Sequence, residues 1–354
     1  MPIENLAELQ TLIERAGLDW RVRDVPADET HGLGRLPSDP AKTRFAFDLG
    51  QQLLARVRAQ EPGVLRNRFI SKADLVGHLK LRLFFFDWRS HDGVIGPVQD
   101  QGRCGSCVSF ATTGLVGAQA AIELGISNLH LSEADQHFCS SHGANCGGWN
   151  NHDALDEIRK RGVLPDSEFP YMSAFDDPPQ WDPAFTDPLW LAHCREQLVF
   201  FRDAYRITNF TAHNGDDRKA YIRTVGPMVC GFTVYEDFDH YAGGVYRHVT
   251  GKVRGGHAVL VVGYSDFENV WICRNSWGTT FGGASQADGT GGGFFKIGYG
   301  DSSIDDEPFY GCRGVILPGL IDIRVPMVKG EPPERIPIPD PPPLRHVRAE
   351  GSAD

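Results

Sequence analysis

The sequence lacks three features that would each assign it to a class of protein. It carries 35 Lys and Arg against 46 Asp and Glu, a net charge of −11, so it has no excess of positive charge for nucleic acid or an anionic membrane surface. No apolar run approaches the ~18 residues that a membrane span needs. Residues 1–18 have acids among their leucines, without the basic start and apolar stretch of a signal peptide. We therefore expect a globular protein with no nucleic-acid and no membrane partner.

The most specific pattern in the chain is the stretch PVQDQGRCGSCVSF at residues 97–110. An irregular, glycine-containing loop there leads into apolar residues at helical spacing, which end at Gly125. Cys107 therefore lies where a loop becomes the N-terminus of a buried helix. The free N–H groups and the dipole of a helix N-terminus favour an anion such as a thiolate. A small buried cysteine in a core helix is the alternative interpretation.

This stretch resembles the papain family of cysteine peptidases, whose signature is C-G-[SA]-C-[WY] with a His and an Asn further along the chain. Residues 104–107 match, and Val108 stands where an aromatic residue is expected. The other matching motifs follow the order of the family: Asp87-Trp88-Arg89, Cys146-Gly147-Gly148-Trp149, Gly256-His257-Ala258-Val259 and Asn275-Ser276-Trp277-Gly278. The resemblance covers roughly residues 83–318.

The resemblance implies an α+β, papain-like two-domain fold: a helical left domain, an antiparallel β-barrel-like right domain, and the active site in the cleft between them. The patterns agree, because residues 94 to about 209 favour helices, whereas short apolar runs bounded by glycines favour strands from Pro227 onward. We expect an N-terminal extension at 1–82, the peptidase domain at 83–318, and an extended or disordered proline-rich tail at 319–354.

The extension predicts two amphipathic helices that need another surface to cover. Asn5 caps the first, and Asp39-Pro40 begins the second, whose apolar stripe is Phe45, Leu49, Leu53 and Val57. The resemblance implies an inhibitory pro-region, so the protein would be made as an autoinhibited zymogen with its own N-terminal segment as intramolecular inhibitor. We expect a part of residues 25–40, kept extended by prolines, to lie across the cleft near Cys107. A plain structural extension is the alternative.

Four residues would carry the chemistry. Cys107 is the nucleophile, and His257 stabilises its thiolate as an ion pair and then protonates the leaving amine. Asn275 would orient the imidazole, and Gln101 would donate to the oxyanion beside the backbone N–H of Cys107.

The function that these residues indicate is a cysteine endopeptidase, which hydrolyses peptide or protein substrates through a thioester and needs no cofactor and no metal. A cysteine acyltransferase or transpeptidase of the same fold would use the same intermediate. A non-catalytic papain-like binding protein is the third interpretation.

The resemblance also places a set of residues around the substrate: Gly147, Gly148, Trp149, Gly231, Gly255, Gly256 and Trp277. Three of them, Trp149, Gly231 and Gly255, would surround the side chain two residues before the scissile bond. Because two glycines leave room and a tryptophan forms an apolar wall, we expect a preference for bulky apolar or aromatic side chains there.

The eight cysteines leave the cellular location open. The resemblance implies disulfides between Cys104 and Cys146 and between Cys139 and Cys194. Disulfides favour an oxidising compartment or non-classical export, whereas the missing signal peptide favours the cytoplasm. A zinc site of Cys139, His142 and Cys146 is an alternative with irregular spacing.

Overall fold

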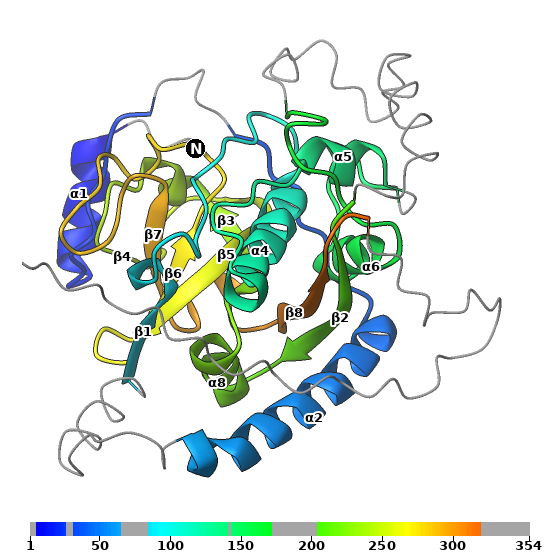
Figure 1. Ribbon diagram of the computed structural model, residues 1–354. Helices are drawn as coiled ribbons and strands as arrows, with labels where there is room; N and C mark the ends of the chain where they lie inside the picture. Colours follow the sequence, from blue (N-terminus) through cyan, green and yellow to red (C-terminus); the bar gives the residue numbers. More distant parts are fainter. Residues whose placement is uncertain (1–4, 26–30, 65–83, 141–142, 172–203, 320–354) are drawn as a thin grey trace, which may run out of the picture. The chain divides into compact units, whose positions relative to one another are not determined.

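A sheet of eight strands, with helices packed around it, forms the centre of the fold (Figure 1). The computed structural model describes residues 5–25, 31–64, 84–140, 143–171 and 204–319, without the side chains of residues 60–64. These residues belong to one compact unit, which ends at Gly319. Cys194, His142 and the predicted proline-rich tail lie outside the described residues.

The sheet has the strand order β2-β8-β3-β5-β6-β7-β4, and β1 pairs with β5. All of its pairings are antiparallel except that of β4 with β7. The strands are β1 (Phe85–Asp87), β2 (Arg206–His213), β3 (Met228–Tyr235), β4 (Val245–Tyr246), β5 (Val253–Ser265), β6 (Val270–Arg274), β7 (Phe294–Gly298) and β8 (Phe309–Ile316). Within the described residues the pairing runs from β2 to β4 without closing, so the sheet is open where a barrel-like one was expected.

The helices are α1 (Leu6–Arg15), α2 (Pro40–Val64), α4 (Cys107–Leu124), α5 (Glu133–Phe138), α6 (Asn151–Lys160) and α8 (Asp216–Thr224). Short 3-10 turns span Trp88–Ser90, Glu236–His240 and Asp301–Ser303. Side chains of Asn5, Ser132 and Asn150 accept hydrogen bonds from the first turns of α1, α5 and α6, as N-caps do. The arrangement is α+β, as predicted.

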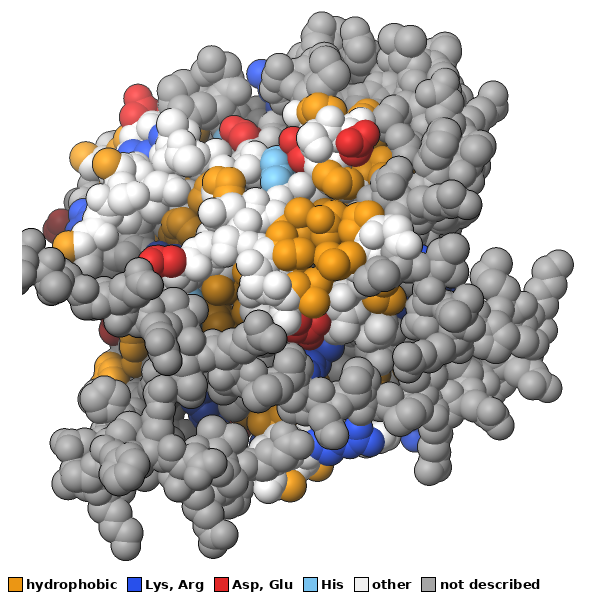
Figure 2. Space-filling view, viewed as in Figure 1, with side chains coloured by type: hydrophobic (Ala, Val, Ile, Leu, Met, Phe, Trp, Pro, Cys, Tyr) orange, Lys and Arg blue, Asp and Glu red, His pale blue; other side chains and the backbone are white. Residues whose placement is uncertain are grey.

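The central helix α4 begins at Cys107, as predicted, and ends at Gly125 in the left-handed conformation. It packs against β5 and β8. Within the described part of the chain, α4 is the one helix that is long and apolar enough to cross a membrane, although the sequence analysis expected no apolar run of that length. In the fold 72% of this helix is buried, as is usual for a core helix. Figure 2 shows hydrophobic side chains gathered on the face where α4 lies, and Leu124 at its end is exposed.

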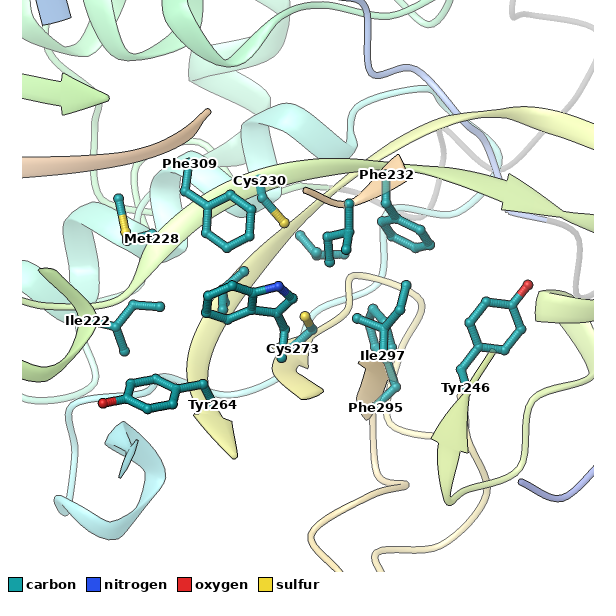
Figure 3. Packing of buried hydrophobic residues seen from close by; sticks show 14 of the residues in the cluster. Ile222, Met228, Cys230, Phe232, Tyr246, Tyr264, Cys273, Phe295, Ile297 and Phe309 are labelled. Atoms are coloured by element: carbon teal, nitrogen blue, oxygen red, sulfur yellow. The ribbon is translucent and has the colours of Figure 1, made fainter. Parts of the chain in front are cut away.

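The main core lies between the strands and is rich in aromatic side chains. Figure 3 shows part of it, with Phe232, Tyr264, Phe295 and Phe309 packed around the thiols of Cys230 and Cys273. Along β3, β5 and β6 these side chains alternate with residues of a second buried cluster on the other face of the sheet, such as Val229, Leu260 and Ile272. Burial on both faces is why short apolar runs bounded by glycines predicted these strands.

Both N-terminal helices pack their apolar side chains against the rest of the fold, as predicted. Leu9 and Ile13 of α1 join the main core, and α2 packs against β2 and α8. The predicted stripe of α2 was wrong at Phe45, which is 66% exposed. The helix crosses β2 at Gly50, where a Cβ would lie 2.6 Å from the carbonyl oxygen of Ala212. This close approach turns Ala46, Leu53 and Leu54 inward.

Candidate active site

Three segments that are far apart in sequence meet at the sulfur of Cys107. Cys107 is the first residue of α4 and is fully buried. Its sulfur accepts hydrogen bonds from the backbone N–H groups of Ala258 on β5, of Gly34 from the N-terminal region and of Val108 in its own helix. The sequence predicted the helix N-terminus, and the fold adds the other two segments.

His257 lies on β5, directly before Ala258, and its ring is held by β6 and the loop that follows. Its Nε2 donates to Oδ1 of Asn275 at 2.7 Å, which fixes the tautomer of the imidazole. Its Nδ1 has no hydrogen-bond partner among the described residues. The ring of Trp277 lies 4.8 Å from that of His257, and both side chains are buried, so water is excluded from the His257–Asn275 bond.

The side-chain amide of Gln101 is oriented by Ser276. The hydroxyl of Ser276 donates to Oε1 of Gln101 at 2.6 Å. The amide nitrogen of Gln101 therefore points the other way and donates to the carbonyl oxygens of Gly32 at 2.9 Å and of Cys104 at 2.8 Å. Sequence reasoning named Ser276 only as part of a motif and missed this contact, although its place next to Asn275 was a usable signal.

Residues 31–36, which we call the arm, cross this site and are paired with protein backbone on both sides. The arm lies within the segment 25–40 that was expected near Cys107. On one side, the N–H of Trp149 donates to Gly34 and the N–H of Leu36 donates to Trp149, each at 2.6 Å. On the other side, the N–H of Arg35 donates to Gly256 on β5 at 3.0 Å.

The arm lies against almost every residue predicted to bind substrate. A Cβ on Gly148 would lie 2.2 Å from the oxygen of Gly34, and one on Gly256 would lie 2.4 Å from the oxygen of Arg35. The predicted substrate-binding residues that meet the arm are Gly148, Trp149, Gly231, Gly255, Gly256 and Trp277. The seventh, Gly147, donates its N–H to the side chain of Asn145.

Trp149 contributes differently from the expectation. Its backbone pairs with the arm, while its side chain is buried in the core cluster around Cys107 and α4. It therefore meets the arm through its peptide group, and its side chain lies in the core and not beside the arm as an apolar wall.

The side chain of Arg35 runs beside Gly231 and forms an ion pair with Glu307. A Cβ at Gly231 would lie 2.2 Å from Nε of Arg35, so only glycine leaves room for this guanidinium. The side chains of Arg35 and Glu307 are 11% and 30% exposed. Sequence reasoning missed Glu307, which belongs to none of the motifs.

At the other end of the arm, His31 lies flat on Trp277. The two rings are 5.2 Å apart with an interplanar angle of 11°. Nε2 of His31 lies 3.3 Å from Oδ1 of Asp100, the residue before Gln101. Burial alone would raise the pKa of Asp100, but the hydrogen bonds from His31 and from the N–H of Gly102 together hold this pKa below its usual value.

The covered site holds its reactive groups in their neutral forms. Burial raises the pKa of Cys107 and lowers the pKa of His257 to about 3. Both groups are therefore uncharged near pH 7 in this covered form, and the thiolate–imidazolium pair of the reacting enzyme stays a prediction. Burial removes the water that would solvate two charges, and for Cys107 it outweighs the opposite effects of the Gly34 N–H and the Arg35 charge.

Among the described cysteines, some form disulfides and the others are buried free thiols. Cys104 and Cys146 form a disulfide that ties the loop before α4 to the Gly147-Gly148 turn. Cys139 is also disulfide-bonded, and its predicted partner Cys194 lies outside the described residues. These bonds consume two of the three ligands of the alternative zinc site. The free thiols of Cys230, Cys273 and Cys312 are buried, which raises their pKa values and makes them unreactive.

Comparison with known proteins gives one consistent family. The family described as "Papain family cysteine protease" matches residues 84–309. Cathepsin B of Dictyostelium discoideum is 31% identical over 221 residues, covering 60% of this chain and 68% of that protein. Pro-cathepsin H of Mus musculus is 31% identical over 210 residues, covering 55% of this chain and 56% of that protein, so the match spans little more than half of that relative.

Two solved structures share the fold at low sequence identity. Procathepsin B S9 from Trypanosoma congolense has a TM-score of 0.58 at 20% identity and covers 88% of this chain and 99% of that one. Xylellain, a cysteine protease from Xylella fastidiosa, has a TM-score of 0.55 at 21% identity and covers 83% of this chain and 100% of that one.

Proposed function

The chain belongs to the papain family of cysteine proteases, and on that premise we propose that it is an endopeptidase whose Cys107, His257 and Asn275 hydrolyse peptide bonds through a thioester. The observation that carries the proposal is the orientation of His257. Its Nε2 is occupied by Asn275, and its Nδ1 is left without a partner within the described structure. An imidazole held in this way has one nitrogen available for proton transfer.

The proposed reaction begins once a peptide replaces the arm. Cys107 gives its thiol proton to Nδ1 of His257, and the thiolate attacks the scissile carbonyl carbon. The negative oxygen that forms is stabilised by the amide of Gln101 and the N–H of Cys107. As the peptide C–N bond breaks, His257 returns the proton to the leaving amine. Water then attacks the thioester, with its proton passing to His257, and the free acid and the thiol are restored.

We propose that the arm is an internal inhibitor and that the full chain is a zymogen. The carbonyl of Gly32 accepts from the amide of Gln101, which is the donor needed by the oxyanion. The N–H of Gly34 donates a hydrogen bond to the sulfur of Cys107, so a substrate carbonyl would have to displace Gly34 to reach the sulfur. The arm and a substrate would compete for the same backbone groups of Trp149 and Gly256.

We propose a basic side chain as the preferred group in the space beside Gly231, in place of the bulky apolar one expected from the sequence. This space already holds the guanidinium of Arg35, and Glu307 provides a carboxylate at its end. The carboxylate attracts the positive charge of a guanidinium, and partial burial strengthens this attraction. An apolar side chain would leave Glu307 without that partner.

Substitution of Cys107 tests the proposed function. Cys107→Ala should lower peptide hydrolysis by on the order of 10⁴-fold or more, because the nucleophile is lost. Cys312→Ala is the matched control, since Cys312 is also a buried free cysteine but lies on β8 outside the site. Activity should be measured on fluorogenic peptides with Arg two residues before the scissile bond, after displacement of the arm. A Cys107→Ala protein that keeps its hydrolytic rate would overturn the proposal.

A further inference from the structure

The N-terminal region consists of two parts that are held in different ways. Leu9, Ile13 and Trp20 are buried completely, with exposed fractions of 1%, 0% and 0%. The arm, in contrast, is held by backbone pairing and by the polar side chains of His31 and Arg35, and it ends at Leu36, which is 49% exposed. Residues 5–24, which we call the anchor, therefore supply three side chains to the protein interior, whereas the arm lies over a site.

The anchor docks on the side of the sheet formed by β4 and β7, where α1 lies in Figure 1. The ring of Trp20 stacks on Tyr241 at 6.4 Å and meets the edge of Tyr246 at 5.3 Å. A Cβ on Gly244 would lie 2.8 Å from Cα of Trp20, so the two backbones are in close contact. Figure 3 shows Tyr246 beside Phe295 in the main core, which the anchor covers.

Backbone hydrogen bonds join the anchor to the same region. The N–H of Arg21 donates to Gly243 at 2.9 Å, and the N–H of Ala242 donates back to Arg21 at 2.8 Å. The N–H of Arg23 donates to His240 at 2.8 Å. The side chain of Arg21 bonds to Gln286 and lies 3.4 Å from the carboxylate of Asp288. The anchor thus pairs like an added antiparallel strand.

Aromatic packing connects the anchor to the active site. Tyr241 packs on Phe281 at 5.8 Å, and Phe281 packs on Trp277 at 5.1 Å. Trp277 in turn covers the ring of His257. Loss of the anchor would open one end of this row of rings to water.

We propose that residues 5–24 are a permanent part of the enzyme and stay bound without a covalent link when the chain is cut between them and the arm. The enzyme freed of its arm would then consist of two chains. The cutting event rests on the proposed function, while the binding of the anchor rests on the contacts above.

The test uses full-length protein carrying Cys107→Ala, in which residues 26–30 are replaced by the recognition site of a sequence-specific serine protease. After complete cutting, the sample is run on size exclusion and each peak is examined on a denaturing gel. The N-terminal fragment should elute with the rest of the protein. Trp20→Ala should release this fragment, and Leu36→Ala, an exposed position in the arm, should leave it bound.

Elution of the fragment on its own from the cut parent protein overturns the proposal, whether or not the remainder stays folded. If uncut Trp20→Ala fails to fold, Ile13→Ala serves as the second variant, and the elution of the parent protein still decides. The readout is independent of catalysis. A failed proposal of inhibition or hydrolysis would appear in activity assays, and a failed proposal for the anchor would appear in the elution profile.

Discussion

The side chain of Arg35 in the arm lies beside Gly231, and the carboxylate of Glu307 forms an ion pair with its guanidinium. The partial burial of this pair removes much of the screening by water, so the loss of one charge is costly. We therefore expect Glu307→Gln to lower kcat/KM for substrates with Arg two residues before the scissile bond by about 10- to 100-fold. Substrates with Leu there should be affected little.

The measurement is a comparison of Arg and Leu peptides on both proteins. Glu268→Gln is a suitable control, because Glu268 pairs with Lys296 on the sheet, away from the arm. Equal losses on both peptides would show that Glu307 acts on stability and not on selectivity. A preference of the parent enzyme for Leu would contradict the specificity proposal.

Residues with local motifs could be predicted, and residues that meet only through the fold could not. Cys107, His257, Asn275 and Gln101 each lie within a short motif, and the structure places their side chains in one region. Glu307 and Arg35 lie near opposite ends of the described chain and in no motif. Their contact depends on how the arm crosses β3 and β5, which no local pattern encodes.

At the scale of elements, the arm leaves no room for a side chain at Gly34. A Cβ at Gly34 would lie 2.0 Å from the carbonyl oxygen of Gly105. This oxygen belongs to the backbone, so it cannot move aside as the end of a flexible side chain could. Gly34→Ala should push the arm from the site and raise the activity of the full-length protein by roughly 10- to 100-fold, since overpacking costs about 1–3 kcal/mol.

Leu36→Ala is the control for this experiment, because its side chain points to solvent at the end of the arm. Initial rates on a fluorogenic peptide, with the concentration of active thiol titrated by an epoxide, give the comparison. Unchanged activity of a folded Gly34→Ala protein would argue against inhibition by the arm.

The docking of α2 should depend on pH through His213. Its ring lies on β2 between α2 and α8: a Cβ on Gly50 would be 2.8 Å from Cε1, and the ring of Tyr221 is 4.7 Å away. Burial lowers the pKa of His213 to about 4, with Asp217 opposing the shift. A histidine whose pKa is lowered in the fold contributes stability above its unfolded pKa, near 6.5, and loses it as the pH falls toward 4.

We expect His213→Leu to flatten the loss of stability between pH 6.5 and pH 4, a change of up to about 3 kcal/mol in the free energy of unfolding. Denaturant unfolding at several pH values measures it. His91→Leu, at an exposed position, should leave the slope unchanged. Because the pKa values of His137 and His257 are also lowered, part of the slope should remain in the variant.

Helices with a clear apolar stripe and strands with a short apolar run were predicted well, whereas elements that mix polar and apolar residues without a pattern were not. The predicted helices at α4, α5 and α6 and the strands at β3, β5, β6 and β7 are present within a few residues of their expected ends. The strand β2 was not predicted, and its first half fell within the region to about residue 209 that was assigned to helices, because its sequence RITNFTAH has no clean alternation. Phe45 was placed inward since the pattern could not show the close crossing of α2 at Gly50.

At the scale of the whole molecule, we expect that the extension at 1–82 cannot be removed as a single part. Deleting it would uncover the core that Leu9, Ile13 and Trp20 close. We therefore expect deletion of residues 1–82 to give an unstable or aggregating protein. Trp20→Ala alone should cost about 3–5 kcal/mol, as other buried aromatic-to-alanine changes do.

Thermal unfolding of the two variants beside the parent protein provides the check. Phe45→Ala, at an exposed site on α2, should leave the melting temperature within about 2 °C of the parent value. A soluble 83–354 protein that melts at the temperature of the full chain would refute the structural role of the extension.

The neutral, covered thiol of Cys107 also has a consequence for chemical durability. Peroxide and alkylating agents react with thiolates that solvent can reach, and oxidation beyond the sulfenic acid is not reversed for most proteins. Because the arm covers Cys107 and burial keeps the proton on its sulfur, the full-length chain should survive oxidants that inactivate the uncovered enzyme. The covered form should therefore keep its thiol intact during storage, and inactivation by oxidants should begin only after the arm has left the site.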